Sequence, residues 1–282
     1  MQIVTRCGRD GPGGEWVYSE WRPPHLAGVV DLMWAFRGPT SNRRKRILPS
    51  GRLELLVNFA DPYRLLEGAG CERLDRVWIG GVLTAPMVVA QPPFQDVMGV
   101  RLRPLAAYAL LATPLCELVG QVVDLHDVVG GAVGELAERC AGIGSAPERF
   151  RTVANWLAAR LTAARSADAT VAWTAGRIDE SGGIVSIRAL RAETGWSKAR
   201  LAATFREQIG LPPKLYARVV RFGRVLSMLQ AGGEPLAEVA LAAGYYDQPH
   251  MNAEFRELGG LVPRAFLAAR HPVGDGTTAA DL

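Results

Sequence analysis

The 282-residue chain is long enough for two domains, each with its own hydrophobic core. A hydrophobic content of 49% and a charged content of 21%, without any low-complexity tract, exclude a disordered chain. The net charge is +4, but residues 184–270 hold 12 Lys and Arg against 7 Asp and Glu, whereas the rest of the chain holds 20 against 21. A surface that meets phosphates would explain this basic excess, and so would an ordinary solvated helical surface.

The amino terminus and the cysteines indicate a cytoplasmic protein. The first residues are polar and rich in glycine, so they lack the apolar core of an export signal. One long apolar run, residues 105–123, is split by Pro114 and therefore predicts two short helices in place of a membrane span. The four cysteines lack the paired spacing of a metal site and are expected to be reduced thiols: Cys7, Cys71, Cys116 and Cys140.

The amino-terminal part alternates short apolar runs with Pro and Gly turns. Residues 1–20 give no clear element, and residues 29–36 fit either a helix or a strand. Residues 46–59 predict a hairpin around the turn Pro49-Ser50-Gly51. Several short strands with this punctuation predict a small barrel or sandwich. Two further strand segments follow the hairpin, at 77–89 and 97–102.

From residue 105 the apolar spacing becomes helical. Residues 141–147 are rich in Gly, Ala and Pro and are expected to be a linker. The tail after Arg270 is rich in Gly, Thr and Ala and is expected to be flexible. The spacing predicts helices over 105–112, 115–119, 128–140, 148–164 and 169–180.

The stretch 184–270 contains the same unit twice. A short apolar helix and a glycine turn precede each copy, at 187–195 and 236–244. A helix, a glycine turn and a second helix in succession predict a helix-turn-helix. The first copy reads Phe205-Arg206-Glu207, Gly210-Leu211, Pro213-Lys214 and Tyr216, and the second reads Phe255-Arg256-Glu257, Gly260-Leu261, Pro263-Arg264 and Phe266.

This duplicated stretch resembles the DNA-binding domain of the AraC/XylS transcription regulators, in which a long helix joins two helix-turn-helix units. Residues 212–230 match that helix, since Pro212-Pro213 opens it and Gly232-Gly233 ends it. The earlier part is similar to an uncharacterised, cupin-like amino-terminal domain found in a subset of these regulators. Its matching residues are Trp34, Leu48-Pro49-Ser50-Gly51, Gly80-Gly81, Gly99-Val100-Arg101-Leu102, Pro104 and Leu125-His126-Asp127.

The resemblance implies an α+β protein in which a small β-barrel-like domain with helices precedes an all-α domain. The expected parts are a sensing or dimerisation domain, a connecting helix, a double helix-turn-helix domain and a flexible tail, at 1–145, 146–168, 169–270 and 271–282. It also implies a regulator that places its two units in successive major grooves, controlled by a small effector or by dimerisation. Duplex DNA is the expected partner, and RNA polymerase, a small effector and a second copy of the chain are further candidates.

Helical spacing divides the second helix of each unit into an inner and an outer face. Leu201, Phe205, Met251 and Phe255 must point inward, and Ser197 and Asp247 are the expected N-caps. Gln and Asn are natural readers of adenine, whereas Lys and Arg suit phosphates or guanine. The residues predicted to contact DNA are Ser197, Lys198, Arg200, Thr204, Arg206, Gln248, His250, Asn252 and Arg256.

Two of these assignments have a plain alternative. Lys198 and Arg200 could be ordinary surface cations, and the recurring Arg206 and Arg256 could form a structural ion pair in place of a phosphate contact. The outer face of the first unit also has few side chains that could hydrogen-bond to base edges, because it carries Ala199, Ala202 and Ala203. We therefore expect the first unit mainly to anchor the protein, with Arg200 as its one reader, and the second unit to discriminate sequence.

Residues that could carry catalysis are sparse. The sequence has no GxSxG, P-loop or GxGxxG motif, and it predicts no enzymatic activity, no cofactor and no metal. His126, Arg101 and Arg103 could line an effector cavity or could be satisfied structural residues. The open alternatives are a small-molecule-binding barrel or enzyme with a helical packing module, and a protein-interaction module. The histidines never cluster: His25, His126, His250 and His271.

Overall fold

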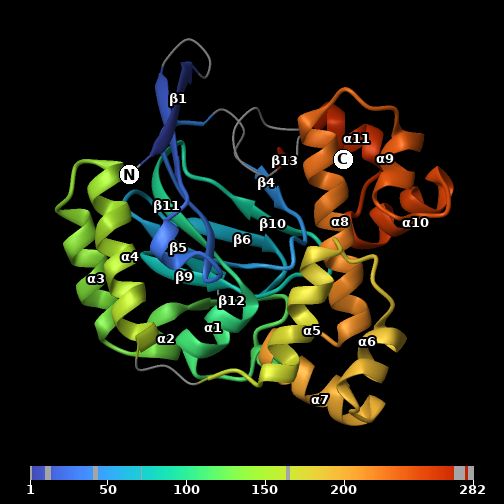
Figure 1. The fold of residues 1–282 in the computed structure, drawn as a ribbon. Coiled ribbons are helices and arrows are strands. Elements are labelled where there is room, and N and C mark those ends of the chain that lie inside the picture. The colour runs from blue at the N-terminus through green and yellow to red at the C-terminus, as the bar shows by residue number, and fades with distance from the viewer. Residues whose placement is uncertain are drawn as a thin grey trace.

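The computed structural model describes residues 2–9, 14–40, 44–70, 72–162, 166–269 and 277–278. A β-rich amino-terminal half and a helical carboxy-terminal half lie side by side (Figure 1). The predicted α+β class, with a sheet domain followed by a helical domain, is confirmed. No helix in the described ranges is long and apolar enough to cross a membrane.

The amino-terminal half is built from two sheets with buried side chains between them. Cross-sheet packing involves Tyr63, Trp78, Met87 and Val97. The eight-stranded sheet has the order β1 (Ile3–Arg9), β2 (Glu15–Trp21), β3 (Val30–Pro39), β11 (Phe94–Leu102), β5 (Leu53–Asn58), β9 (Val77–Gly80), β12 (Gln121–Asp124) and β7 (Ala69–Gly70). The five-stranded sheet has the order β13 (Thr277–Thr278), β4 (Arg44–Ile47), β10 (Met87–Ala90), β6 (Tyr63–Glu67) and β8 (Arg73–Leu74).

The predicted hairpin over residues 46–59 is wrong, because its two strands enter different sheets. β4 pairs with β10, whereas β5 pairs with β9 and β11. The turn between them packs on the helical half. Gly51 has a φ of +70°, and a Cβ placed on it would lie 3.4 Å from Cγ2 of Val220. The turn therefore forms a contact between the two halves and does not connect two strands that pair with each other.

Other strand predictions are changed in detail. Residues 1–21 contain β1 and β2; none of the seven β1 residues Ile3–Arg9 has a buried side chain, so the strand shows no inward periodicity. The ambiguous segment 29–36 is strand, as β3. The segment 77–89 is two strands, β9 and β10, and sequence analysis missed β12.

The helices follow the predicted boundaries most closely after residue 165. Gly130 divides the predicted helix 128–140 into two, because its φ of +75° and ψ of −163° interrupt the helical backbone. The short helices are η2 (Pro24–Leu26), η3 (Leu115–Glu117) and α2 (Leu125–Val129). The longer ones are α1 (Pro104–Leu111), α3 (Ala132–Ala141), α4 (Ala146–Thr162), α5 (Ala169–Glu180), α6 (Ile187–Thr194), α7 (Lys198–Ile209), α8 (Pro213–Ala231), α9 (Leu236–Ala242), α10 (Gln248–Gly259) and α11 (Pro263–Ala269).

The two halves share one continuous hydrophobic cluster, which extends from Trp21 in β2 to Phe266 in α11. α1 and η3 pack against α7, and Tyr108 OH donates to Oε1 of Glu207 at 2.8 Å. Within the predicted flexible tail, residues 277–278 pair with β4. The first helix-turn-helix unit is thus held directly against the amino-terminal half.

Candidate nucleic-acid interface

The first helix-turn-helix unit consists of α6, a turn and α7. Gly195 ends α6 in the left-handed conformation, with a φ of +67°, which an L side chain adopts only with strain. Ser197 then caps α7, since its Oγ accepts a hydrogen bond from the backbone N–H of Arg200 at 3.2 Å. Leu201 and Phe205 are buried. Both the predicted N-cap and the predicted inner face of this helix are confirmed.

The second unit repeats this construction with α9 and α10. Gly244 lies in the turn with a φ of +80°, and Oδ1 of Asp247 accepts from the backbone N–H of His250 at 2.8 Å. Met251 and Phe255 are buried, as the spacing predicts. The two units lie at opposite ends of α8 (Figure 1).

Equivalent ring contacts attach the two units to the same scaffold. In the first unit the ring centroids of Phe205 and Tyr216 are 5.7 Å apart. In the second unit the ring of Phe255 lies 4.9 Å from that of Phe222 and 5.9 Å from that of Phe266. Tyr216 and Phe266 occupy the same place in the repeat. α8 therefore fixes how far apart α7 and α10 lie.

The predicted DNA-contacting residues differ in how far their side chains are exposed to solvent. Three of them, Thr204, Gln248 and Asn252, are only half-exposed, and Oδ1 of Asn252 is shielded without a hydrogen-bond partner in the described part of the chain. Thr204 aligns with Glu254 of the second unit, which faces α8, so Thr204 lies closer to the inner face than expected. The exposed residues are Ser197, Lys198, Arg200, Arg206, His250 and Arg256.

Two aromatic rings at the same repeat position were missed by the sequence analysis. Trp196 directly precedes the N-cap of α7, and the guanidinium carbon of Arg200 lies 4.0 Å from its ring centroid. Tyr246 directly precedes the N-cap of α10 and is 87% exposed. The alignment of the two copies could have identified them. Trp196 orients Arg200 along the surface of the first unit.

The structure bears on the ion pair considered for the recurring arginines, Arg206 and Arg256. Among the described residues, neither Arg206 nor Arg256 makes an ion pair, so the structural ion pair considered for them is not formed there. Their exposed guanidinium groups are free to meet solvent or phosphate.

A buried ion-pair cluster joins α10 to α8, and sequence analysis did not foresee it. Oε2 of Glu254, whose side chain is 6% exposed, accepts from Arg218 at 2.9 Å and from Arg221 at 2.8 Å. Tyr245 OH donates to Oε1 of Glu254 at 2.7 Å. Burial alone would raise the pKa of Glu254, but the hydrogen bonds from Tyr245, Arg218 and Arg221 outweigh it and hold the pKa below its usual range. The cluster orients the second unit on α8.

A second polar cluster joins the two halves. The guanidinium of Arg52 donates to Oδ2 of Asp179 and to Tyr216 OH, both at 3.1 Å, and Tyr216 OH donates to Asp179 at 2.8 Å. Arg52 also pairs with Asp31, which Arg103 binds at 2.7 Å. Burial alone would raise the pKa of Asp31, but Arg52 and Arg103 hold it below its usual range. The sequence analysis assigned none of the Arg52 contacts.

Among the described residues, no three His, Cys, Asp or Glu side chains gather closely enough to hold a metal ion. The described cysteines Cys7, Cys116 and Cys140 are free thiols. Cys71 and His271, both considered in the sequence analysis, lie outside the described residues.

Comparison with known proteins assigns the helical half. Residues 190–269 match a family model described as a helix-turn-helix domain. This part of the chain is an AraC-type helix-turn-helix domain. The AraC-type domain follows a second matched region, residues 22–124, which belongs to a domain family of unknown function, DUF6597. The predicted family resemblance is confirmed for both regions.

Individual relatives are distant or partial. The chain is 34% identical over 67 residues to the uncharacterized HTH-type transcriptional regulator YbfI of Bacillus subtilis strain 168, a match that spans 24% of each protein. The chain therefore covers about a quarter of that relative. Apo ToxT K231A from Vibrio cholerae strain SCE256 is 10% identical with a TM-score of 0.50, covering 84% of this chain and 96% of that one. This likeness shows a shared two-part fold alone.

A second similar structure covers a smaller part of the chain. The carboxy-terminal domain of AraT, a response regulator from Geobacillus stearothermophilus, is 17% identical with a TM-score of 0.35. It covers 38% of this chain and 89% of that one.

Proposed function

We propose that the protein is a sequence-specific DNA-binding transcription regulator that places α7 and α10 in successive major grooves of one duplex. The observation that supports this most strongly is the duplication itself. Two capped helices with exposed outer faces stand at the two ends of one helix, α8, in a domain of the AraC type. The basic excess of residues 184–270 suits a phosphate surface better than a protein partner.

We assign different tasks to the two units. The first unit anchors the protein, because its outer face carries Lys198 and Arg200 among alanines, and Trp196 holds Arg200 in place. The second unit reads bases through Gln248 and Asn252, together with His250. Arg206 and Arg256 contact phosphates, and Ser197 lies at a helix N-terminus where a phosphate oxygen also fits. Thr204, like Gln248 and Asn252, is only half-exposed.

Control by a small effector or by dimerisation is assigned to the amino-terminal half. The contact of α7 with α1 and the Arg52 cluster give that half two direct connections to the DNA-binding domain. Recruitment of RNA polymerase and formation of a dimer are further parts of this proposal. The rival function, an enzyme in the barrel, finds no group of three or more His, Cys, Asp or Glu side chains that could hold a catalytic metal ion among the described residues.

Binding of the full chain to duplex DNA should depend steeply on salt. About six phosphate contacts imply a loss of affinity of roughly a thousandfold between about 50 and 200 mM salt, because each contact releases counterions. Fluorescence anisotropy with a labelled duplex measures this directly. An affinity at low salt no better than that of an acidic control protein would rule out the regulator.

Substitutions in the two units should have different consequences. Gln248→Ala and Asn252→Ala should each relax sequence preference at one half-site by about 1–3 kcal/mol per lost base contact. Lys198→Ala should weaken all sequences alike and lower the salt slope by about one. Binding-site selection from a random pool reports both effects. Arg151→Ala, an exposed cation on α4, is the control and should change neither. A changed preferred sequence in Lys198→Ala alone would reverse the assignment.

A further inference from the structure

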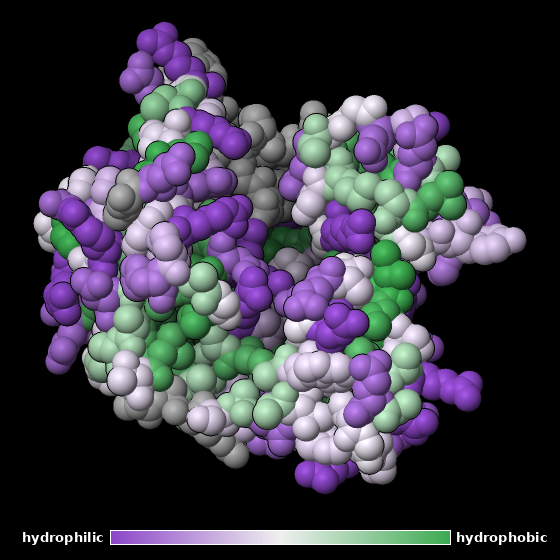
Figure 2. Space-filling model, viewed as in Figure 1, coloured by the Kyte–Doolittle hydropathy of each residue, from purple (hydrophilic) through white to green (hydrophobic). Residues whose placement is uncertain are grey.

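A cavity of about 1150 Å³ lies between the eight-stranded sheet, the loop and strand around β4, and α8. Figure 2 shows the hollow between the two halves of the molecule, with hydrophobic residues at its floor. Its volume is sufficient for a drug-sized ligand. α8 contributes Val220, Gly223, Arg224, Leu226, Ser227 and Gln230 to the wall.

The floor of the cavity contains a flat aromatic surface. The indole of Trp34 lies across β11 because position 99 is glycine, and a Cβ there would stand 2.3 Å from the ring. Nε1 of Trp34 donates to Oε1 of Glu54 at 2.6 Å, which fixes the ring in that orientation. The ring of Tyr18 is stacked beside it, with centroids 6.4 Å apart and an interplanar angle of 24°. Lys45 Nζ lies over the Trp34 ring, 5.7 Å from its centroid, so the ring already attracts one cation of the chain.

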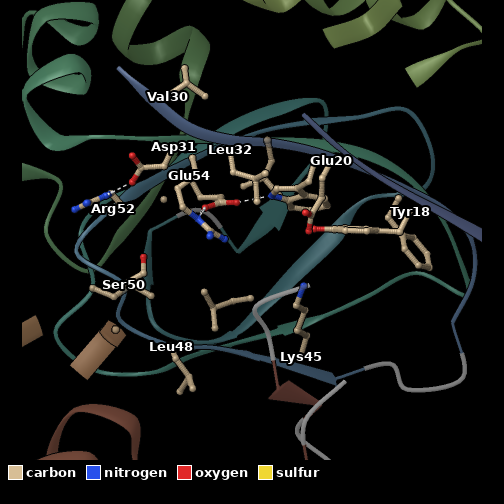
Figure 3. Close-up of a pocket in the computed structure, with 18 of the residues that line it drawn as sticks. Tyr18, Glu20, Val30, Asp31, Leu32, Lys45, Leu48, Ser50, Arg52 and Glu54 are labelled. Carbon is tan, nitrogen blue, oxygen red and sulfur yellow. Dashed lines mark hydrogen bonds and ion pairs between the residues drawn. The ribbon is translucent and has the colours of Figure 1, made fainter. Parts of the chain in front are cut away.

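One acidic group in the cavity lacks a partner. Glu20 stands on β2 directly opposite Trp34 of β3 and lines the cavity beside Tyr18. Its side chain is half-buried, and among the described residues it makes no hydrogen bond or ion pair. Figure 3 shows Glu20 and Tyr18 extending into the cavity opposite Lys45. An unpaired, half-buried carboxylate on the wall of a cavity can bind a cationic ligand through a charge-assisted hydrogen bond.

The other buried charges of the cavity are already satisfied. Both oxygens of Glu54 are used, since Arg101 binds Oε2 at 3.3 Å. Asp31 is bound by Arg52 and Arg103. Arg101 and Arg103 thus line the cavity but are paired, whereas His126 is exposed on α2 and does not line it. Arg22 and Arg224, at the margin, are exposed to water and need no ligand to balance them.

We propose that this cavity is the effector site of the regulator and that its ligand is a planar ring compound carrying a protonated nitrogen. The ring stacks on Trp34, which Tyr18 supports from beside it, and the charged nitrogen binds the carboxylate of Glu20. The effector role rests on the proposed function. Since α8 forms one wall of the cavity and carries both DNA-binding units, a ligand bound there can influence how those units meet DNA. The ligand should bind in the cavity whether or not DNA is present.

Three probes of one shape and different charge test the ligand class on the full chain. They are 2-naphthylmethylammonium, the neutral 2-naphthylmethanol and the anionic 2-naphthoate, titrated calorimetrically at neutral pH. The cation should bind about tenfold or more tighter than the alcohol, because a hydrogen bond to a charged group contributes at least that much. The anion should bind more weakly than the alcohol.

Glu20→Gln tests the residue that sets this preference. It keeps the shape of the side chain and should bring the cation to the affinity of the alcohol while leaving the alcohol unchanged. Glu15→Gln is the matched control, since Glu15 lies on the same strand with its side chain 76% exposed, and it should bind like the unmodified protein. If Glu20→Gln does not fold, the ranking of the three probes on the unmodified protein decides. Tightest binding of the anion, or no binding by any probe, would overturn the proposal.

A second arm separates the effector role from DNA binding. The affinity of the unmodified protein for a duplex selected from a random pool should change at least about fivefold with the cation present, as expected for allosteric coupling. Glu20→Gln should bind the duplex normally and show no such change. Cation binding without any effect on DNA affinity would overturn the effector role alone. Absence of DNA binding under all conditions would overturn the proposed function and leave the ligand result standing.

Discussion

Phe255→Ala should destabilise the protein by about 3–5 kcal/mol and abolish DNA binding, because truncating a buried Phe leaves a cavity that the core cannot close. The ring of Phe255 is buried and contacts Phe222 on α8 and Phe266 on α11. Its loss separates α10 from both helices. Thermal and urea melts, followed by circular dichroism, measure the effect.

Leu241→Ala is the matched control for this prediction. Leu241 is on α9 of the same unit but is 64% exposed, so its truncation should change stability by less than about 0.5 kcal/mol. An unchanged melting temperature in Phe255→Ala would show that the inner face of α10 is misassigned. Equal losses in the two variants would show that the assay does not distinguish core from surface.

Glu254→Ala should be the second strongly destabilising substitution, by about 3–5 kcal/mol, because it leaves the partly buried Arg221 without a counter-charge. Arg218 and Arg221 both bind this carboxylate. Glu257→Ala is the control: Glu257 also binds Arg218, but its side chain is 63% exposed, so the expected loss is below about 1 kcal/mol. Equal stability of Glu254→Ala and the unmodified protein would exclude a structural role for the cluster.

The same carboxylate predicts a dependence of stability on acid. The pKa of Glu254 in the folded protein lies below its ordinary value of 4.5, so its stabilising contribution is complete above that pH. The contribution is lost as the pH falls below 4.5 and through the folded pKa. The unmodified protein should therefore lose more stability on acidification than Glu254→Ala. Parallel loss in urea melts across this range would contradict the lowered pKa.

The helical half could be predicted from sequence because its signals are local. Ser197 and Asp247 as caps, Gly195 and Gly244 in the turns, and the inward spacing of four apolar residues all lie within a few positions of the structure they determine. Each of these local patterns occurs twice in the sequence, once in each helix-turn-helix unit. Thr204 is half-exposed and its counterpart Glu254 turns toward α8, so its contact with DNA stays a prediction.

The sheets and the two polar clusters could not be predicted, because their partners are far apart in the chain. Arg52 binds Asp179 across 127 residues, and nothing near either residue indicates the pair. β4 and β5 are adjacent in sequence but pair with different strands, because the turn between them is held by α8. Glu20 and Trp34 lie side by side because β2 pairs with β3, and the sequence near either residue does not indicate that pairing.

The most direct test of the account is a hydroxyl-radical footprint of the full chain on a duplex obtained by selection from a random pool. Because α7 and α10 are held at the two ends of α8, the account predicts two protected segments on one face of the duplex. Their centres should lie about one helical turn apart, roughly 34 Å or about 10 base pairs. Asn252→Ala should weaken one segment more than the other. A single protected segment, or protection that does not depend on sequence, would contradict a regulator with two helix-turn-helix units on one face of DNA.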